Sequence, residues 1–379
     1  MLLYIHVPFC RQKCRYCGFE SAPPGPGQEE LFVRGVCHEA RVRANGLDSL
    51  EVRTLYVGGG TPSLLTPTSL ARILETVRSS FDLAPSAEIT VEANPESAEN
   101  KEFHSTLVRL GVNRLSLGVQ ALDDEMLRLL GRTHTRAQAL RSIDLARRAG
   151  LDNIGLDLIW GLPGQSLRQW LGQLKEAVRL RPRHLSCYGL SLEPGTPMAR
   201  DVESGLLALP EEREQSQMYV LGAEYLESVG LIQYEVSNFS VMDYTGSHNL
   251  GYWAGEDYIG LGPGAVSTIG SRRWKNPFPL DDYLRAMSLG LWDENREDLL
   301  PIDRTNEFIM LSLRTTKGLD IREYTGRTGH DIRTRHRQTI RALRSAGLAR
   351  LTASHLRLTK TGMVVGNQII TRFMLDREN

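Results

Sequence analysis

Three cysteines lie close together near the start of the chain, in the run CRQKCRYCGF. Cys10, Cys14 and Cys17 follow a C-x3-C-x2-C spacing, whereas the other two cysteines, Cys37 and Cys187, are isolated. Three thiols cannot pair as disulfides without one left over, so we interpret the run as a metal site. A zinc site normally closes with a fourth Cys or His. An iron–sulfur cluster held by only three thiolates instead keeps one iron open, so the spacing favours a cluster that another ligand completes.

Two simpler explanations of this run remain open. The thiols could be reduced structural residues, or they could bind zinc with His6 as the fourth ligand. The basic neighbours Arg11, Lys13 and Arg15 would lower thiol pKa values and so favour metal binding, but they are equally ordinary surface charges. The run alone therefore does not decide between these explanations.

A run of three glycines follows the apolar segment VRTLYV. Gly58, Gly59 and Gly60 permit a tight turn and a close approach of backbone or ligand that side chains would block. The run lacks the Gly-Lys-Ser/Thr of a P-loop and the spaced glycines of a dinucleotide fingerprint. Its backbone groups could bind a carboxylate or an amine-bearing ligand near an iron, and a plain tight turn is the alternative.

Further polar residues stand at or near predicted strand ends. They are Glu92, Gln120, Arg132 and Asp157. Partly buried carboxylates and an arginine need partners, and one zwitterionic, ribose-bearing ligand could satisfy all of them. For each residue, pairing with its neighbours at the rim of the sheet is an equally good explanation.

The segment HNLGYW combines an imidazole, an amide and two aromatic rings. His248 could ligate a haem iron while Tyr252 and Trp253 flank an apolar macrocycle. The alternative is that His248 is a hydrogen-bonded structural residue in a glycine-rich loop.

The C-terminal segment is basic. Residues 321–379 hold twelve Lys and Arg against four Asp and Glu. Such an excess could bind nucleic acid electrostatically. Nucleic acid is nevertheless not the partner we expect, because no aromatic residues interleave with the basic ones to stack on bases, and a solvated basic face explains the excess equally well.

The composition is that of an ordinary soluble globular protein. Hydrophobic residues make up 41% of the chain, and the formal net charge is zero. No signal peptide or membrane-spanning stretch is evident, so we expect no membrane insertion. Few cysteines, clustered at motif spacing, indicate a reducing compartment, and we expect a cytoplasmic location.

The elements that must position these residues alternate along the chain. Apolar, β-rich runs are followed by amphipathic helical patterns, which is typical of βα units and a parallel sheet. We expect six strands, at residues 2–7, 52–57, 87–93, 114–119, 153–160 and 184–192. The pattern fits an incomplete (β/α) barrel or a doubly wound sheet. Both folds bring the carboxyl ends of the strands to one rim, where the cysteine run, the glycine run and the EANP, GVQ and GLPGQ stretches all fall.

Beyond the strands the chain divides into three predicted parts. Residues 1–235 form the α/β part, residues 236–295 form an extension that caps it and carries the HNLGYW motif, and residues 296–379 form a small module. We expect two helices and a β-hairpin in that module, similar to a winged helix.

The motifs together resemble those of the radical S-adenosylmethionine (SAM) superfamily. YIHVPFCRQKCRYCGF and GGGTP carry this resemblance. VEANPES, GLDLIWGLPGQS, HNLGYW and DYIGLGPGA narrow it to the oxygen-independent coproporphyrinogen III oxidase-like group. The coproporphyrinogen dehydrogenase itself has an extra cysteine where this chain has Phe19, and a longer segment before the motif. The chain is therefore most similar to the HemW-like haem chaperones of the group.

The resemblance implies an incomplete (β/α)6 barrel followed by the winged-helix-like α+β module. It also implies that Cys10, Cys14 and Cys17 hold a [4Fe-4S] cluster whose open iron binds SAM. In this superfamily the reduced cluster cleaves SAM to methionine and a 5′-deoxyadenosyl radical. The residues that the resemblance implies around SAM are Tyr4, Phe19, Gly59, Gly60, Thr61, Glu92, Gln120, Arg132 and Asp157.

For function, the resemblance implies a chaperone that binds haem and delivers it to haem-requiring membrane or respiratory proteins. It also implies a homodimer, and it leaves open whether the protein is an enzyme. Two alternatives stay open: oxidative decarboxylation of coproporphyrinogen III, and a radical SAM enzyme that acts on RNA.

Overall fold

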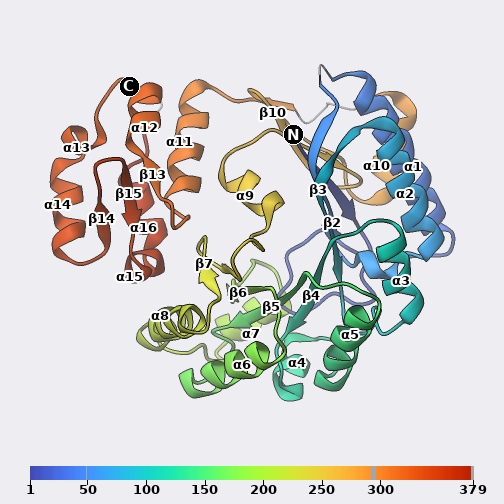
Figure 1. Cartoon of the computed structure of the whole chain (residues 1–379), viewed down its shortest axis with the longest axis horizontal. Helices are drawn as coiled ribbons and strands as arrows, with labels where there is room; N and C mark the ends of the chain where they lie inside the picture. The colour runs from blue at the N-terminus through green and yellow to red at the C-terminus, as the bar shows by residue number, and fades with distance from the viewer. Residues whose placement is uncertain (48, 292–295, 377–379) are drawn as a thin grey trace.

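The computed structural model describes residues 1–47, 49–291 and 296–376 of the chain. Six parallel strands form its centre and lie side by side in chain order. They are β1 (Leu2–Val7), β2 (Glu51–Gly59), β3 (Asp82–Ala93), β4 (Arg114–Gln120), β5 (Ile154–Trp160) and β6 (His184–Gly189). All six predicted strands are confirmed, and the curved, open sheet in Figure 1 is the expected incomplete barrel.

Two strand boundaries differ from the prediction by more than two residues. β3 starts at Asp82, because Asp82 and Leu83 pair with the first residues of β2 before a register shift. That irregularity accommodates Pro85, which cannot donate to a regular ladder. β6 ends at Gly189 rather than at residue 192, because β5 ends at Trp160, the partner of Gly189.

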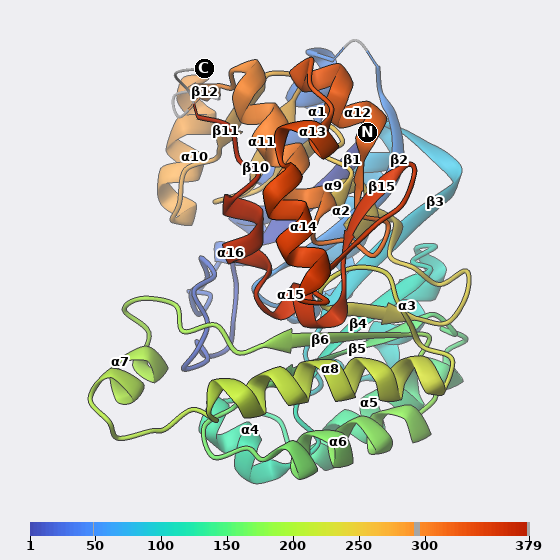
Figure 2. The same cartoon turned by 90° about the vertical axis from the view of Figure 1, so that its left-hand side faces the viewer.

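Helices cover the outer face of the sheet, as Figures 1 and 2 show. They are α1 (Gln28–Asn45), α2 (Pro67–Ser80), α3 (Lys101–Arg109), α4 (Asp124–Leu130), α5 (Arg136–Arg148), α6 (Leu167–Arg179) and α8 (Glu212–Ser228). Two shorter helices, the 3-10 helix η1 (Pro62–Leu64) and α7 (Pro197–Glu203), lie instead in the loops that follow β2 and β6. Several begin at clear capping residues. Thr66 accepts a hydrogen bond from the Ser69 amide, and Pro67 occupies the first turn of α2.

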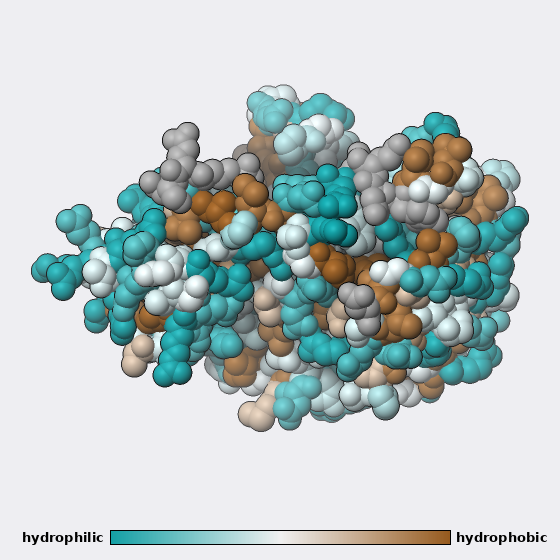
Figure 3. Space-filling model, turned by 90° about the horizontal axis from the view of Figure 1, so that it is seen from above, coloured by the Kyte–Doolittle hydropathy of each residue, from teal (hydrophilic) through white to brown (hydrophobic). Residues whose placement is uncertain are grey.

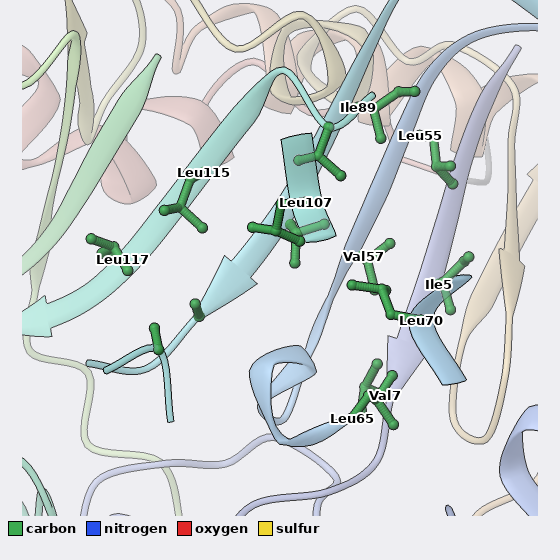
Figure 4. Packing of buried hydrophobic residues seen from close by; sticks show 14 of the residues in the cluster. Ile5, Val7, Leu55, Val57, Leu65, Leu70, Ile89, Leu107, Leu115 and Leu117 are labelled. Carbon is green, nitrogen blue, oxygen red and sulfur yellow. The ribbon is translucent and has the colours of Figure 1, made fainter. Parts of the chain in front are cut away.

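The two faces of the sheet differ in chemistry. Ile5, Val57 and Leu117 are buried with the helices in one large hydrophobic cluster, part of which Figure 4 shows. Successive side chains of a strand point to opposite faces of the sheet. The residues next to these three on their strands therefore point to the inner face of the sheet, and they are often polar. A parallel sheet covered on both faces is usually apolar on both. The polar inner face therefore indicates that this side of the sheet serves a purpose other than core packing.

Further strands extend the sheet at both edges. Beside β1 lie β9 (Tyr258–Leu261), which is parallel to it, and then β10 (Val266–Ile269), β11 (Arg272–Lys275) and β12 (Arg296–Asp298). Beyond β6 lie the antiparallel β8 (Asn238–Ser240) and β7 (Ile232–Gln233). Two helices complete this region, α9 (Ser247–Trp253) and α10 (Leu280–Leu289). The HNLGYW motif is thus helical, and the expectation of a glycine-rich loop there was wrong.

The C-terminal module has its own hydrophobic cluster. It consists of α11 (Pro301–Ser312), β13 (Leu319–Asp320), α12 (Ile321–Thr328), α13 (Ile332–Arg335), α14 (Arg337–Ser345), β14 (Ala349–Leu351), β15 (His355–Leu358), α15 (Lys360–Val364) and α16 (Gly366–Thr371). The three strands form an antiparallel sheet in the order β13-β15-β14. The predicted hairpin is β14–β15. The additional strand β13 pairs with β15, and the sequence after the hairpin forms two short helices.

No helix among the described residues is long and apolar enough to cross a membrane. The division of the chain at residues 235 and 295 stays a prediction.

One buried carboxylate ties the edge extension to the first helix of the barrel. Glu39 of α1 is fully buried and accepts hydrogen bonds from the Gly262 amide, the Asn276 amide group and the Tyr283 hydroxyl, each at 2.8 Å. Arg43, one turn further along α1, lies 3.5 Å from its carboxylate. Four partners thus converge on one side chain, which fixes the segment after β9 against α1.

We predict that Glu39→Ala lowers the free energy of unfolding by about 2–4 kcal/mol, because it leaves buried donors without an acceptor. Urea denaturation followed by circular dichroism measures this change. Glu75→Ala, on the exposed face of α2, is the control and should change stability by less than about 0.5 kcal/mol. Equal effects of the two substitutions would contradict the role assigned to Glu39.

Candidate functional site

The three cysteines lie on one loop at the carboxyl end of β1. Each is a free thiol and is partly exposed. Backbone hydrogen bonds hold both sides of the loop, from the Cys10 amide to Ala22 at 3.1 Å and from the Arg15 amide to Leu130 at 3.0 Å. The loop is therefore fixed to the rim of the barrel, with its thiols available to a ligand.

Two side chains, from the loops after β2 and α4, donate hydrogen bonds to these sulfurs. The Thr61 hydroxyl lies 3.5 Å from Cys10 Sγ, and Arg132 Nη1 lies 3.4 Å from Cys14 Sγ. Burial raises the pKa of the Cys17 thiol, and the nearby Cys14 and Cys10 add to this effect. The three thiols are thus electrostatic neighbours, and a cationic centre would favour their ionised form.

The arrangement differs from a site for a single metal ion. Within the described residues, no group of three His, Cys, Asp or Glu side chains is arranged to hold one ion. Both ring nitrogens of His6 already have partners, Tyr4 Oη at 3.1 Å and the Glu20 carbonyl oxygen at 3.0 Å. His6 is therefore engaged elsewhere and does not complete a zinc site in this structure. Three thiols on one loop match the donor set of a cluster, in which each thiolate binds a different iron.

The glycine run lets two backbones meet at the base of the cysteine loop. The Gly60 amide donates to the Val7 carbonyl oxygen at 2.7 Å, and a Cβ at Gly60 would lie 2.4 Å from the Phe9 carbonyl oxygen. Gly59 has φ of 104°, and a Cβ there would lie 2.6 Å from His6 Nδ1. Glycine is needed at both positions because any side chain would push the loop away.

Glu92, at the end of β3, is the central acid of the inner face. It accepts hydrogen bonds from the Tyr56 hydroxyl at 2.6 Å and from the Gly59 amide at 3.2 Å. Burial raises the pKa of Glu92 to about 7, and the charge of Asp157 adds to the rise. A buried carboxyl that titrates near neutrality is suited to bind a cationic group, which would restore its charge.

Asp157 and Tyr4 belong to the same polar face. Ser116 donates to the Asp157 carboxylate at 3.1 Å, and burial raises the pKa of Asp157. Burial also raises the pKa of Tyr4, to which the charge of Glu92 contributes. Four strands thus contribute Tyr4, Glu92, Ser116 and Asp157 to one connected region.

Gln120 and Arg132 meet at Asn94, a residue that our sequence reasoning did not single out. Asn94 accepts from Arg132 Nη2 at 2.5 Å and donates to Thr61 Oγ1 at 3.0 Å. A Cβ at Gly118 would lie 3.0 Å from both Asn94 Oδ1 and Gln120 Nε2. Arg132 Nε is buried without a hydrogen-bond partner among the described residues. Gln120 has φ of 62°, which is a strained conformation typical of functional sites.

The sequence held a signal for two of the residues that were missed. Asn94 lies within the quoted EANP motif, two residues after Glu92. Tyr56 is separated by one residue from both Thr54 and Gly58 on β2, so a period of two places all three on the inner face. Both residues could have been selected on these grounds.

His248 lies apart from the cysteine loop, on α9 against β2. It is 2% exposed, and its Nδ1 lies 2.8 Å from the Thr54 hydroxyl. Its ring stacks on Tyr56 with centroids 5.0 Å apart, while its Nε2 is buried without a partner among the described residues. Burial lowers the pKa of His248 to about 3, so the imidazole is neutral.

Phe19 is exposed over 67% of its surface, just beyond Cys17. Among the described residues, no hydrogen bond or ring contact joins it to the inner polar face, so its predicted role beside SAM stays a prediction.

Comparisons with known proteins agree with this geometry. The Radical SAM superfamily model matches residues 4–176, and the HemN C-terminal domain model matches residues 299–365. The solved structure described as coproporphyrinogen III oxidase (HemN) from Escherichia coli has a TM-score of 0.84 and covers 98% of this chain. The chain covers 89% of that structure. At 22% sequence identity, this likeness concerns the fold.

Curated relatives are similar over nearly their whole length. Heme chaperone HemW of Escherichia coli (strain K12) is 35% identical over 386 residues, which cover 99% of this chain and 98% of that protein. Heme chaperone HemW of Lactococcus lactis is 32% identical, with 99% and 98% covered. With the cysteine loop and glycine run in the same chain, these matches show that it belongs to the HemW family of the radical SAM superfamily.

Proposed function

We propose that the protein is a haem chaperone that carries a [4Fe-4S] cluster, binds haem and delivers it to haem-requiring proteins. The observation that carries this proposal is the arrangement at the rim: three thiols on one fixed loop, with exposed Phe19 where the dehydrogenases of the group have a further cysteine. The names of the full-length relatives support the same function.

Membership of the radical SAM family implies a cluster and SAM, and the residues present fit both. Cys10, Cys14 and Cys17 would bind three irons, and Thr61 and Arg132 already donate to two of their sulfurs. Such donors stabilise negative charge on cluster sulfurs and so tune the reduction potential. When bound, the reduced cluster supplies the electron that cleaves SAM in this superfamily.

The SAM site proposed here occupies the polar inner face beside the loop. Glu92 would bind the amino group, because it is a buried acid whose pKa is about 7. The Tyr56 hydroxyl and the Gly59 amide donate to its carboxylate and hold it in position. Asp157, Gln120, Tyr4 and the backbone at Gly59 would surround the rest of the molecule. The buried, unpartnered Arg132 Nε is a donor available to a carboxylate or to the cluster.

His248 is the proposed haem ligand. Its imidazole is neutral, and neutral imidazole is the form that coordinates iron. Its hydrogen bond to Thr54 orients the ring and leaves Nε2 for the metal. Because His248 is 2% exposed, haem binding in this position requires α9 to move away from β2.

The proposed recipients are membrane or respiratory haem proteins, and the proposed setting is the cytoplasm. A homodimer is part of the same proposal.

The function is tested by haem titration of anaerobically reconstituted protein, followed by absorbance. We expect stoichiometric binding and no decarboxylated product when coproporphyrinogen III is supplied to the same sample. His248→Ala should lose most of the affinity, whereas His104→Ala, a buried histidine on the outer side of the barrel, should retain it. Product formation without stable haem binding would contradict the chaperone and favour the decarboxylase.

The cluster ligands are tested by substitution. We expect each single variant, Cys10→Ala, Cys14→Ala or Cys17→Ala, to lose most of its iron and acid-labile sulfide after anaerobic reconstitution, because a cubane cluster needs every protein thiolate it has. Cys187→Ala removes a buried cysteine of the hydrophobic core, and this variant should bind as much iron as the wild type. A wild-type iron content in any of the three loop variants would exclude that cysteine as a ligand.

The Glu92 assignment predicts a pH dependence of SAM binding. Above its pKa of about 7 the carboxyl is ionised and attracts the ammonium group of SAM, whereas below it the neutral acid does not. Isothermal titration calorimetry of the cluster-loaded protein should show that affinity falls about tenfold from about pH 8 to about pH 6. Glu92→Gln should bind weakly at both pH values, and an unchanged pH dependence in this variant would contradict the assignment.

A further inference from the structure

The C-terminal module carries a basic surface that the proposed function does not use. Nine Lys and Arg residues and no Asp or Glu lie between Ile332 and Leu375, in a chain whose total formal charge is zero. The rest of the chain is therefore acidic by the same amount. Such a separation of charge within one protein indicates an anionic partner for the basic part.

The fold gathers part of this charge on one helix. The module follows the winged-helix order of helix, strand, two main helices and hairpin, with the short α13 between α12 and α14, and α14 takes the place of the recognition helix. Arg337, Arg341 and Arg344 are spaced i, i+4 and i+7 on α14, so they form one stripe along it. All three are exposed, while Ile340 and Leu343 face the core.

The hairpin adds two further arginines. Arg350 on β14 and Arg357 on β15 stand directly opposite each other in the antiparallel register, and both are exposed. Like charges directly opposite each other destabilise a sheet unless an anion lies between or above them. The pair is thus an unfavourable arrangement for the isolated module and a favourable one for a module bound to phosphate.

These guanidinium groups are available to a partner. Among the described residues, no acidic side chain lies within ion-pair distance of the three arginines of α14 or the two of the hairpin. By contrast, Arg327 pairs with Glu323, Arg333 with Asp331 and Lys360 with Glu227. Figures 1 and 2 show α14 on the side of the module that faces away from the barrel, with the hairpin beside it. Hydrophilic side chains dominate that end of the molecule in Figure 3.

The shape and chemistry of this surface favour one kind of polyanion. Arginine binds phosphate oxygens through a planar fork, and all five groups are arginines. Between residues 301 and 363, none of the described large apolar side chains is exposed, so this surface has no residue to insert into a lipid bilayer. It likewise has no exposed aromatic ring on which unpaired bases could stack. A convex helix of about 14 Å beside a hairpin instead fits the grooved backbone of a duplex.

We propose that the C-terminal module docks on the phosphate backbone of a nucleic-acid duplex, without sequence preference, through Arg337, Arg341, Arg344, Arg350 and Arg357. The proposal goes beyond haem delivery and does not depend on it. The lack of aromatic residues among the basic ones weighs against a nucleic-acid partner in the sequence alone. That objection concerns single strands, whereas backbone contacts to a duplex need only charge and shape.

The test uses full-length, cluster-loaded protein and a fluorescein-labelled DNA duplex of about 20 base pairs and mixed sequence. Fluorescence anisotropy is measured from about 50 to about 200 mM NaCl. We expect the affinity to fall with salt, with a slope of log K against log [NaCl] of about −4.5 for five phosphate contacts. The variant R337Q/R341Q/R344Q should bind at least about tenfold more weakly at low salt, with a slope smaller by about 2 to 3.

A matched control removes three exposed arginines from the barrel helices α6 and α8, as R168Q/R179Q/R213Q. It changes the net charge equally and should leave binding within about twofold. Thermal denaturation checks that both triple variants fold. The proposal fails if the wild type does not bind the duplex or if the two triple variants lose affinity equally. It also fails if the protein binds vesicles of anionic phospholipid through these arginines while ignoring the duplex, which would assign the surface to a membrane.

Discussion

The candidate site depends on the close approach of two backbones at the carboxyl ends of β1 and β2. The Gly60 amide bonds to Val7, and the chain entering the cysteine loop passes where a Cβ of Gly60 would lie. This contact fixes where Cys10 begins and brings it within reach of the Thr61 hydroxyl. The same turn aims the Gly59 amide at Glu92. One steric requirement therefore sets both the cysteine loop and the acid that lies beside it.

The polar inner face is the second feature on which the function rests. Burying Glu92, Asp157 and their hydroxyl partners costs free energy that an apolar barrel interior would not. The apolar outer face compensates for this cost, since the large cluster that it forms with the helices holds the sheet without help from inside. The pKa of Glu92 is raised because burial disfavours its ionised form, which is the same cost. A ligand with a complementary cation would recover part of it.

The parallel sheet and the rim could be predicted from sequence because strand alternation and the βα order depend on local patterns. The common location of the three-cysteine loop, the glycine run and Glu92 could be predicted from the same order, since parallel strands end at one rim. The additional edge strands could not be predicted in this way. β9 is short, and it pairs with β1, which lies more than two hundred residues earlier in the sequence. Local sequence patterns do not indicate such a pairing. The helical form of HNLGYW could not be predicted either, because Gly251 lowers the helix propensity of the segment. Its conformation is set by burial against Leu2 and Thr54 of the sheet.

The proposed function requires that haem passes from this chain to other proteins. The most direct measurement mixes haem-loaded, cluster-containing protein with membranes from haem-depleted cells and follows the appearance of a haem-loaded cytochrome spectrum in the membrane fraction. The proposed function predicts that haem transfer from the wild-type protein is faster than transfer from free haem, and that Cys14→Ala loses this transfer. Haem that stays with the protein, or transfer that is no faster than from free haem, would contradict it.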